Sequence, residues 1–281
     1  MSLVATLATN HALQDLTYFL QSLMLWPEPP TVYLYADSLV KNSLKSIKYS
    51  GKLVVKEALN PYSDRTRTQM EKMPGINSGK SLWYEFQMEK LALLDWVFDS
   101  EAATSGVHYL DSDIFFLSSL PVVPAGYDVA ISPHEIRQRD EALYGKYNAG
   151  YVWLRTKDAV QAWRDACTTS RFFEQAALEV FDSEPWSTRA YHFPLQENYG
   201  WWRMFQGKKG GAELQREWTI FRSPAHSGIL VGGSPLRSVH THWITTDFTT
   251  GTFNAFVITL LKKLAPSHIP ARKILVALSK R

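Results

Sequence analysis

The stretch Val107-His108-Tyr109-Leu110-Asp111-Ser112-Asp113-Ile114-Phe115-Phe116-Leu117 places two aspartates between two apolar runs. A buried strand has no use for Asp111 and Asp113, because an unpaired carboxylate in apolar surroundings is very costly. The pattern therefore predicts a strand that ends at Leu110 and presents both carboxylates at the sheet edge where open α/β sheets bind ligands. Two carboxylates separated by the small Ser112 can hold one divalent cation, and substrate phosphates can complete its coordination.

The N-terminal part of the chain alternates between strand and helix patterns. Short apolar runs predict strands at Leu3 to Ala8, Thr31 to Tyr35 and Leu53 to Val55, and the first intervening helix is ended by Pro27. This order is one βαβαβ half of a nucleotide-binding sheet. Right-handed crossovers would bring the ends of the first two strands to the same edge.

That edge makes Ala8, Thr9, Asn10 and Asp37 candidates for nucleotide contact. For Asn10 and Asp37, capping of the following helix is an equally good interpretation. Residues 60–80 are rich in Pro, Gly, Ser and Thr, and they predict a long irregular loop, which in compact domains is usually functional or disordered.

Composition narrows the class of protein. The 281 residues, 45% hydrophobic and 20% charged, predict one elaborated globular domain. The single Cys167 excludes an intramolecular disulfide framework and fits a reducing compartment. The first residues lack the pattern of a signal peptide, and no run approaches the roughly 18 apolar residues of a membrane-spanning helix. We therefore expect a cytoplasmic protein.

Two motifs in combination resemble the GT-A glycosyltransferases. Asp-Ser-Asp after an apolar strand resembles their DxD motif, and Tyr147-Asn148-Ala149-Gly150-Tyr151-Val152, some thirty-five residues later, resembles the F-N-[AS]-G-V element of the same superfamily. The pair is a more specific signal than either motif alone. Gly150 permits close approach of the backbone to a ligand, and the Asn148 amide can bond sugar hydroxyls.

Other segments are similar to glycosyltransferase family 8. Gln87-Met88-Glu89-Lys90 resembles the lysine-bearing helix that precedes DxD, although Lys90 is equally well interpreted as a solvated surface charge. The family contacts its donor sugar through an Asp-Gln pair, which corresponds here to Glu174 and Gln175, with Glu in place of Asp. A competing segment, Leu195 to Trp202, sets Glu197 against an aromatic block. It predicts either an acceptor pocket or a core helix with a polar cap.

The family's third metal ligand is a histidine near its C-terminal end. Ser238-Val239-His240-Thr241-His242-Trp243 supplies two candidates, and His240 and His242 would share one face of a strand. Imidazole accompanies carboxylates on Mn²⁺, and the chain offers no Cys partners for a zinc pair. The Gly-x-x-Lys-Pro-Trp that usually follows the family's histidine is absent here.

The sequence thus predicts an α/β protein with a GT-A fold, a Rossmann-like mixed central sheet flanked by helices. Residues 1–250 would form the catalytic domain, with 1–117 as its nucleotide-binding half and 118–250 as its acceptor-binding half. The nucleotide-sugar site is expected to include Ala8, Thr9, Asn10, Asp37, Lys90, Asp111, Ser112, Asp113, Asn148, Ala149 and Gly150. The catalytic candidates are Glu174, Gln175 and Glu197, and the metal candidates are Asp111, Asp113, His240 and His242.

The resemblance implies transfer of a sugar from a nucleotide-diphosphate sugar to a glycan, lipid-linked or protein acceptor, with Mn²⁺ or Mg²⁺ on the diphosphate. It favours retention of configuration, whereas inversion would need a base, for which Glu174 or Glu197 is available. One alternative is a nucleotidyltransferase or sugar pyrophosphorylase, but the usual Gly-rich loop is absent after the first strand. The other alternative is a non-catalytic nucleotide-sugar binding module. Nothing in the sequence indicates a nucleic-acid partner.

Residues 251–281 predict a basic helical tail. Six basic and no acidic residues occur from Phe253 to Arg281, and they are Lys262, Lys263, Arg272, Lys273, Lys280 and Arg281. A basic amphipathic segment is typical of an interfacial anchor on anionic lipid, here at the inner face of a membrane. The alternative is a helix packed on the sheet, followed by a soluble cationic end.

Overall fold

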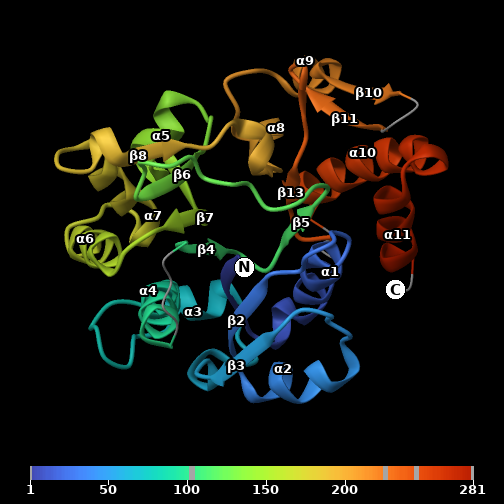
Figure 1. Cartoon of the computed structure of the whole chain (residues 1–281). Helices are drawn as coiled ribbons and strands as arrows, with labels where there is room; N and C mark the ends of the chain where they lie inside the picture. Colours follow the sequence, from blue (N-terminus) through green and yellow to red (C-terminus); the bar gives the residue numbers. More distant parts are fainter. Residues whose placement is uncertain (1, 101–104, 224–226, 244–246, 280–281) are drawn as a thin grey trace.

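The computed structural model describes residues 2–100, 105–223, 227–243 and 247–279, and a seven-stranded mixed sheet lies at its centre (Figure 1). The strand order is β3-β2-β1-β4-β7-β6-β8. The strands are β1 (Leu3–Ala8), β2 (Thr31–Ala36), β3 (Leu53–Glu57), β4 (Val107–Leu110), β6 (Val129–Pro133), β7 (Tyr147–Leu154) and β8 (Ala190–His192). The first four are parallel, and β7 runs antiparallel to both β4 and β6. The predicted α/β class with a mixed central sheet is confirmed.

Helices cover both faces of this sheet (Figure 1). They are α1 (Leu13–Leu23), α2 (Ser38–Ser43), α3 (Arg67–Lys72), α4 (Leu82–Ser100), α5 (Gln138–Tyr144), α6 (Lys157–Cys167), α7 (Phe173–Ala177), α8 (Trp202–Gln206), α9 (Gly211–Glu217), α10 (Phe248–Leu264) and α11 (Ile269–Leu278). None of the helices in the described ranges is long and apolar enough to cross a bilayer.

Alternation along the strands decides which helix covers which face. Successive side chains of a strand point to opposite faces. On β1, Leu7 therefore belongs to the same core cluster as Leu94 of α4 and Trp163 of α6, whereas Val4 belongs to a different cluster that includes Leu16 of α1. Fully burying one such side chain contributes about 1.5–3 kcal/mol, so the two covered faces fix the central sheet.

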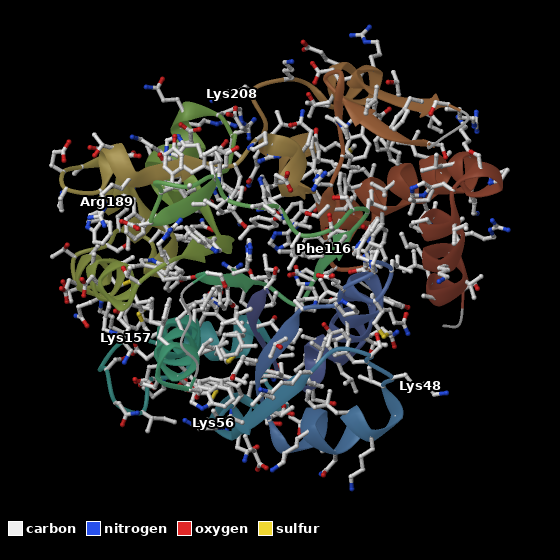
Figure 2. The ribbon with its side chains drawn as sticks, in the orientation of Figure 1. Lys48, Lys56, Phe116, Lys157, Arg189 and Lys208 are labelled. Atoms are coloured by element: carbon white, nitrogen blue, oxygen red, sulfur yellow. The ribbon has the colours of Figure 1, made fainter. Side chains whose placement is uncertain are left out.

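A second core lies beyond the end of β4. A small sheet joins β5 (Ile114–Phe116), β13 (Ser238–His240) and β9 (Tyr199–Gly200), and a second one joins β10 (Trp218–Arg222), β11 (Ser227–Val231) and β12 (Ser234–Pro235). Figure 2 shows Phe116 of β5 in the interior, where it is fully buried, and the labelled lysines at the periphery.

Helices α10 and α11 pack into this second core. Phe253 of α10 and Ile274 of α11 are buried in one cluster with Phe115. The predicted boundary between residues 250 and 251 lies inside α10, so the helices expected as a tail are attached to the body by buried apolar contacts. Lys280 and Arg281, counted in the predicted basic tail, lie outside the described residues.

The prediction of an irregular loop over residues 60–80 is wrong for residues 67–72, which form α3. Thr66 accepts a hydrogen bond from the backbone N–H of Gln69, and the Gln69 side chain accepts one from the backbone N–H of Thr66. This capping box is itself a sequence signature of a helix start. The surrounding Pro and Gly residues obscured it.

Candidate functional site

A cavity of about 490 Å³ opens at the carboxyl ends of β1 and β4. Its size is typical of small-molecule sites, which measure roughly 300–1,000 Å³. The predicted site residues that line it are Ala8, Thr9, Lys90, Asp111, Ser112, Asp113, Asn148, Gly150, Glu174, Gln175, His240 and His242. Asn10, Asp37, Ala149 and Glu197 are not among the residues that line it.

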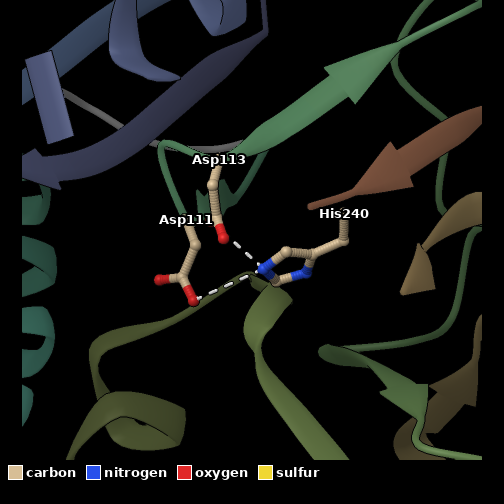
Figure 3. A group of neighbouring side chains, drawn as sticks. All are labelled: Asp111, Asp113 and His240. Carbon is tan, nitrogen blue, oxygen red and sulfur yellow. Dashed lines mark ion pairs between the residues drawn. The ribbon is translucent and has the colours of Figure 1, made fainter. Parts of the chain in front are cut away.

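Asp111, Asp113 and His240 face one another in this cavity (Figure 3). The Nε2 atom of His240 lies 3.1 Å from Asp113 Oδ1 and 4.0 Å from Asp111 Oδ2. One ligand atom from each residue lies within 4.8 Å of the other two. Antiparallel pairing of β5 with β13 creates this arrangement, because Ile114, next to Asp113, is in register with His240.

A chain of amide hydrogen bonds determines which nitrogen of His240 carries the proton. The backbone N–H of Gly150 donates to Asn148 Oδ1 (3.2 Å), so this oxygen is an acceptor. Asn198 Nδ2 donates to the same oxygen (3.0 Å), which leaves Asn198 Oδ1 as the acceptor that faces His240 Nδ1 at 3.1 Å. His240 Nδ1 must therefore carry a proton, and in the neutral ring Nε2 holds a lone pair.

That lone pair is directed at two carboxylates. Three acceptors at this separation repel one another unless a proton or a cation lies between them. Carboxylate oxygens with one imidazole nitrogen are a donor set suited to Mn²⁺, and carboxylates also suit Mg²⁺. Metal-bound histidines characteristically donate their other ring N–H to a polar partner, as His240 does to Asn198. The residues present therefore fit a divalent cation.

His242 occupies a different position from His240. Strand β13 ends at His240, so the expected shared strand face is not formed. His242 Nδ1 lies 3.4 Å from Asp113 Oδ2 and 3.1 Å from Asp15 Oδ2. Asp113 first, and Asp15 after it, outweigh burial and raise the pKa of His242 to about 9. Burial alone would raise the pKa of Asp113, but His240 and His242 hold it below its ordinary value.

Lys90 is buried, which excludes its interpretation as a solvated surface charge. Its Nζ lies 2.6 Å from Glu174 Oε1 and 3.5 Å from Asp111 Oδ1. Burial alone would lower the pKa of Lys90, but Asp111 and Glu174 together raise it above its ordinary value. Tyr109 also donates to Asp111 Oδ1, at 2.8 Å. These contacts hold one oxygen of Asp111 and leave the other facing His240.

Close packing of β7 against Asp111 requires a glycine. The backbone N–H of Asp111 donates to the carbonyl of Gly150 at 2.8 Å. A Cβ atom at position 150 would lie only 2.2 Å from Asp111 Oδ2 and 2.7 Å from His240 Cε1. Gly150 thus allows the backbone to approach the candidate metal ligands themselves.

Two of the predicted nucleotide contacts, Asp37 and Asn10, lie outside the lining of the cavity. Asp37 caps α2, because its Oδ1 accepts a hydrogen bond from Val40 N–H at 2.8 Å. Its Oδ2 accepts from the backbone N–H of Asn10 (2.8 Å) and from the Ser63 hydroxyl (2.9 Å). Asn10 lies in a short 3-10 helix, Asn10–Ala12, whose N-cap is Thr9. The capping interpretation is thus correct for Asp37, and Asn10 does not cap α1.

Glu197 and Ala149 also point elsewhere. Glu197 Oε1 lies 3.3 Å from Arg237 Nε, and Ala149 is buried in the core on the α4 side of the sheet.

Gln175 donates to the carbonyl of Tyr144 at 2.8 Å. Asn148 lines the cavity, but its amide is occupied by Gly150, Asn198 and, at 3.5 Å, His134. Its predicted bond to a sugar hydroxyl remains a prediction.

Sequence reasoning missed several residues of the cavity. The lining also includes His11, Asp15, Arg65, Arg67, Trp83, Phe86, Phe172, Phe173 and Trp201. A signal existed for Asp15, because an acidic residue among the apolar positions of a helix needs a buried partner. Phe173 has a positive φ of 44°, which is uncommon for a bulky residue and sets the backbone direction directly before Glu174.

Replacing Asn198 with leucine should weaken Mn²⁺ binding by about 10–100-fold, the usual cost of losing an outer partner of a metal ligand. Without the Asn198 oxygen, the His240 ring is free to carry its proton on Nε2. Isothermal titration with Mn²⁺ measures the affinity, and ¹⁵N spectra of the histidine ring report the tautomer.

Asn254→Leu is the matched control, because Asn254 is also buried and bonds to Thr241 and to the carbonyl of His242 but not to His240. Equal losses of Mn²⁺ affinity in both variants would contradict this role for Asn198.

Comparison with known proteins supports the fold. No protein-family model and no curated protein sequence matches this chain. The structure of galactosyltransferase LgtC, solved with donor and acceptor sugar analogs, is similar with a TM-score of 0.52 at 10% identity, over 90% of this chain and 93% of that chain. The structure of the apo form of glycosyltransferase GlyE from Streptococcus pneumoniae TIGR4 is similar with a TM-score of 0.50 at 17% identity, over 88% of this chain. The present chain spans 55% of GlyE. These similarities show that the chain has the GT-A fold.

Proposed function

We propose that this protein is a metal-dependent glycosyltransferase that moves a sugar from a nucleotide-diphosphate sugar to an acceptor hydroxyl. The observation that supports this proposal most directly is the triad of Asp111, Asp113 and His240, in which the Nε2 lone pair of His240 faces both carboxylates. The triad lies in a cavity at the strand ends of a GT-A fold. The structurally similar proteins are themselves glycosyltransferases, which supports the proposal.

Asp111, Asp113 and His240 would hold Mn²⁺ or Mg²⁺. When bound, such an ion supplies Lewis-acid stabilisation of the charge that develops on the leaving nucleoside diphosphate. The protein's own part is to fix the ligands before substrate arrives. Lys90 holds Asp111 by one oxygen, and Asn198 fixes the His240 ring. Such preorganisation avoids reorganisation at the moment of reaction.

We assign one side of the cavity to the nucleotide of the donor and the other side to the acceptor. Ala8 is the last residue of β1 and Thr9 follows it, and Arg65 and Trp83 line the cavity with them. These groups offer positive charge and an aromatic face to a nucleotide. In this proposal residues 1–117 hold the nucleotide and residues 118–250 receive the acceptor, which is a hydroxyl on a glycan, lipid or protein.

Glu174 and Gln175 belong to α7 and line the same cavity. Burial raises the pKa of Glu174 and Lys90 opposes this, and the carboxylate is held 2.6 Å from the Lys90 ammonium. We assign Glu174 to orienting Lys90 and the neighbouring sugar, because its charge is already paired.

A panel of nucleotide sugars, assayed with Mn²⁺ and with chelator, tests the function. We expect at least one donor to release nucleoside diphosphate, and that release should stop when the metal is removed. The Asp113→Asn protein, purified in parallel, controls for contaminating phosphatases. Release that is indifferent to chelator, or no turnover and no Mn²⁺-dependent binding of any donor, would contradict the proposal.

A further inference from the structure

A second cavity, of about 430 Å³, lies between α1 and α11. Its lining shares no residue with the first cavity: Asp15 of α1 lines the first, whereas Tyr18 and Gln21, further along the same helix, line the second. Met24, Phe115, Ile274 and Val276 belong to its apolar wall. Nothing in the proposed glycosyl transfer uses this space.

The surface beside the cavity is positively charged. Helices α10 and α11 carry no acidic residue from Phe248 to Leu278. Their exposed basic residues are Lys262, Lys263, Arg272 and Lys273. Lys273 lines the cavity, and Val276, 50% exposed, lies one helical turn further along α11. A ligand that fits both features has an apolar chain and an anionic head.

We infer that the groove between α1 and α11 binds an acyl chain of an anionic lipid, whose head group contacts the basic residues of α10 and α11. Each basic residue near an anionic surface strengthens binding about fivefold. The inference does not depend on the proposed transfer reaction, since it rests on a different cavity.

This mode differs from insertion of the whole C-terminal segment. Ala271, Ile274 and Leu278 are buried against the body of the protein and are not available to enter a membrane. Deleting α11 would therefore expose the second core and would not test lipid binding. Substitutions at exposed positions are the appropriate test.

Co-sedimentation of the full chain with vesicles tests the charge requirement. We expect binding to phosphatidylcholine vesicles that contain phosphatidylglycerol, and none to phosphatidylcholine alone. Lys273→Glu should weaken this binding by at least about fivefold. Lys56→Glu should not, because Lys56 lies on β3, away from α11 (Figure 2). No binding at low salt, or equal weakening by both variants, would overturn the inference.

Titration with decanoate, a single anionic chain, tests the groove itself and distinguishes a free fatty acid from a lipid surface. We expect decanoate to bind the native protein and to bind Val276→Asn markedly less well, and circular dichroism confirms that the variant is folded. Val276 is half exposed, so asparagine is tolerated there. Unchanged decanoate binding in Val276→Asn, or no decanoate binding to the native protein, would show that the groove does not take a chain.

Discussion

Replacing Asp113 with asparagine should reduce metal-dependent release of nucleoside diphosphate by at least about 1,000-fold, because metal ions contribute several kcal/mol of charge stabilisation. Asp113 is the residue shared by both histidines: Oδ1 lies 3.1 Å from His240 and Oδ2 lies 3.4 Å from His242. Asparagine has nearly the same shape but turns one acceptor into a donor and removes the charge. The fold should therefore persist while the cation site is lost.

The measurement is nucleoside diphosphate release at saturating Mn²⁺, with thermal unfolding as the check on folding. Asp99→Asn is the control, since this carboxylate is exposed and its partner is Lys157 on the surface. The control should keep full activity. Near-native activity in Asp113→Asn would remove Asp113 from the site and would contradict the proposed metal dependence.

Replacing Gly150 with alanine should have the second largest effect, and it adds only one methyl group. The new Cβ would meet Asp111 Oδ2 at 2.2 Å and His240 Cε1 at 2.7 Å, so the carboxylate, the imidazole ring or both have to move. Overpacking of this kind costs about 1–3 kcal/mol of stability. We expect an additional loss of Mn²⁺ affinity, because the displaced group belongs to the triad.

The informative readout is the change in melting temperature on adding Mn²⁺. A ligand that binds only the folded state raises the melting temperature, so the native protein should respond and Gly150→Ala should not. Gly251→Ala, inside α10 with no atom within 4 Å of the added Cβ, is the control. It should be neutral or stabilising, by up to about 1 kcal/mol. A normal Mn²⁺ response in Gly150→Ala would show that the triad tolerates the methyl group.

The strands of the central sheet could be predicted from the sequence, because the patterns that indicate a strand are local. Strand β1 spans Leu3–Ala8 as predicted, since a short apolar run between polar residues has few other interpretations. Strand β3 is longer than expected and runs to Glu57, because an edge strand tolerates polar residues at its end. Residues 67–72 were missed because composition outweighed the capping signal.

The candidate site was predictable only where it is built from contiguous motifs. Asp111 and Asp113 stand in one motif and His240 in another, so all three could be proposed. Asn198 acts on His240 from 42 residues away, and Asp15 meets His242 across 227 residues. Such pairings are set by how helices and strands pack, and no local pattern in a single sequence records them.

Strand β5 has a consequence for the synthesis of this protein. It begins directly after Asp113, yet its partner is β13, near the other end of the chain. A ribosome adds about 5–20 residues per second, so β5 emerges well before β13 is made. During that interval the two carboxylates are present without their histidine. A chain released early, before His240, would contain both carboxylates but could not assemble the triad of Asp111, Asp113 and His240, so the proposed cation site would be absent from an incomplete product.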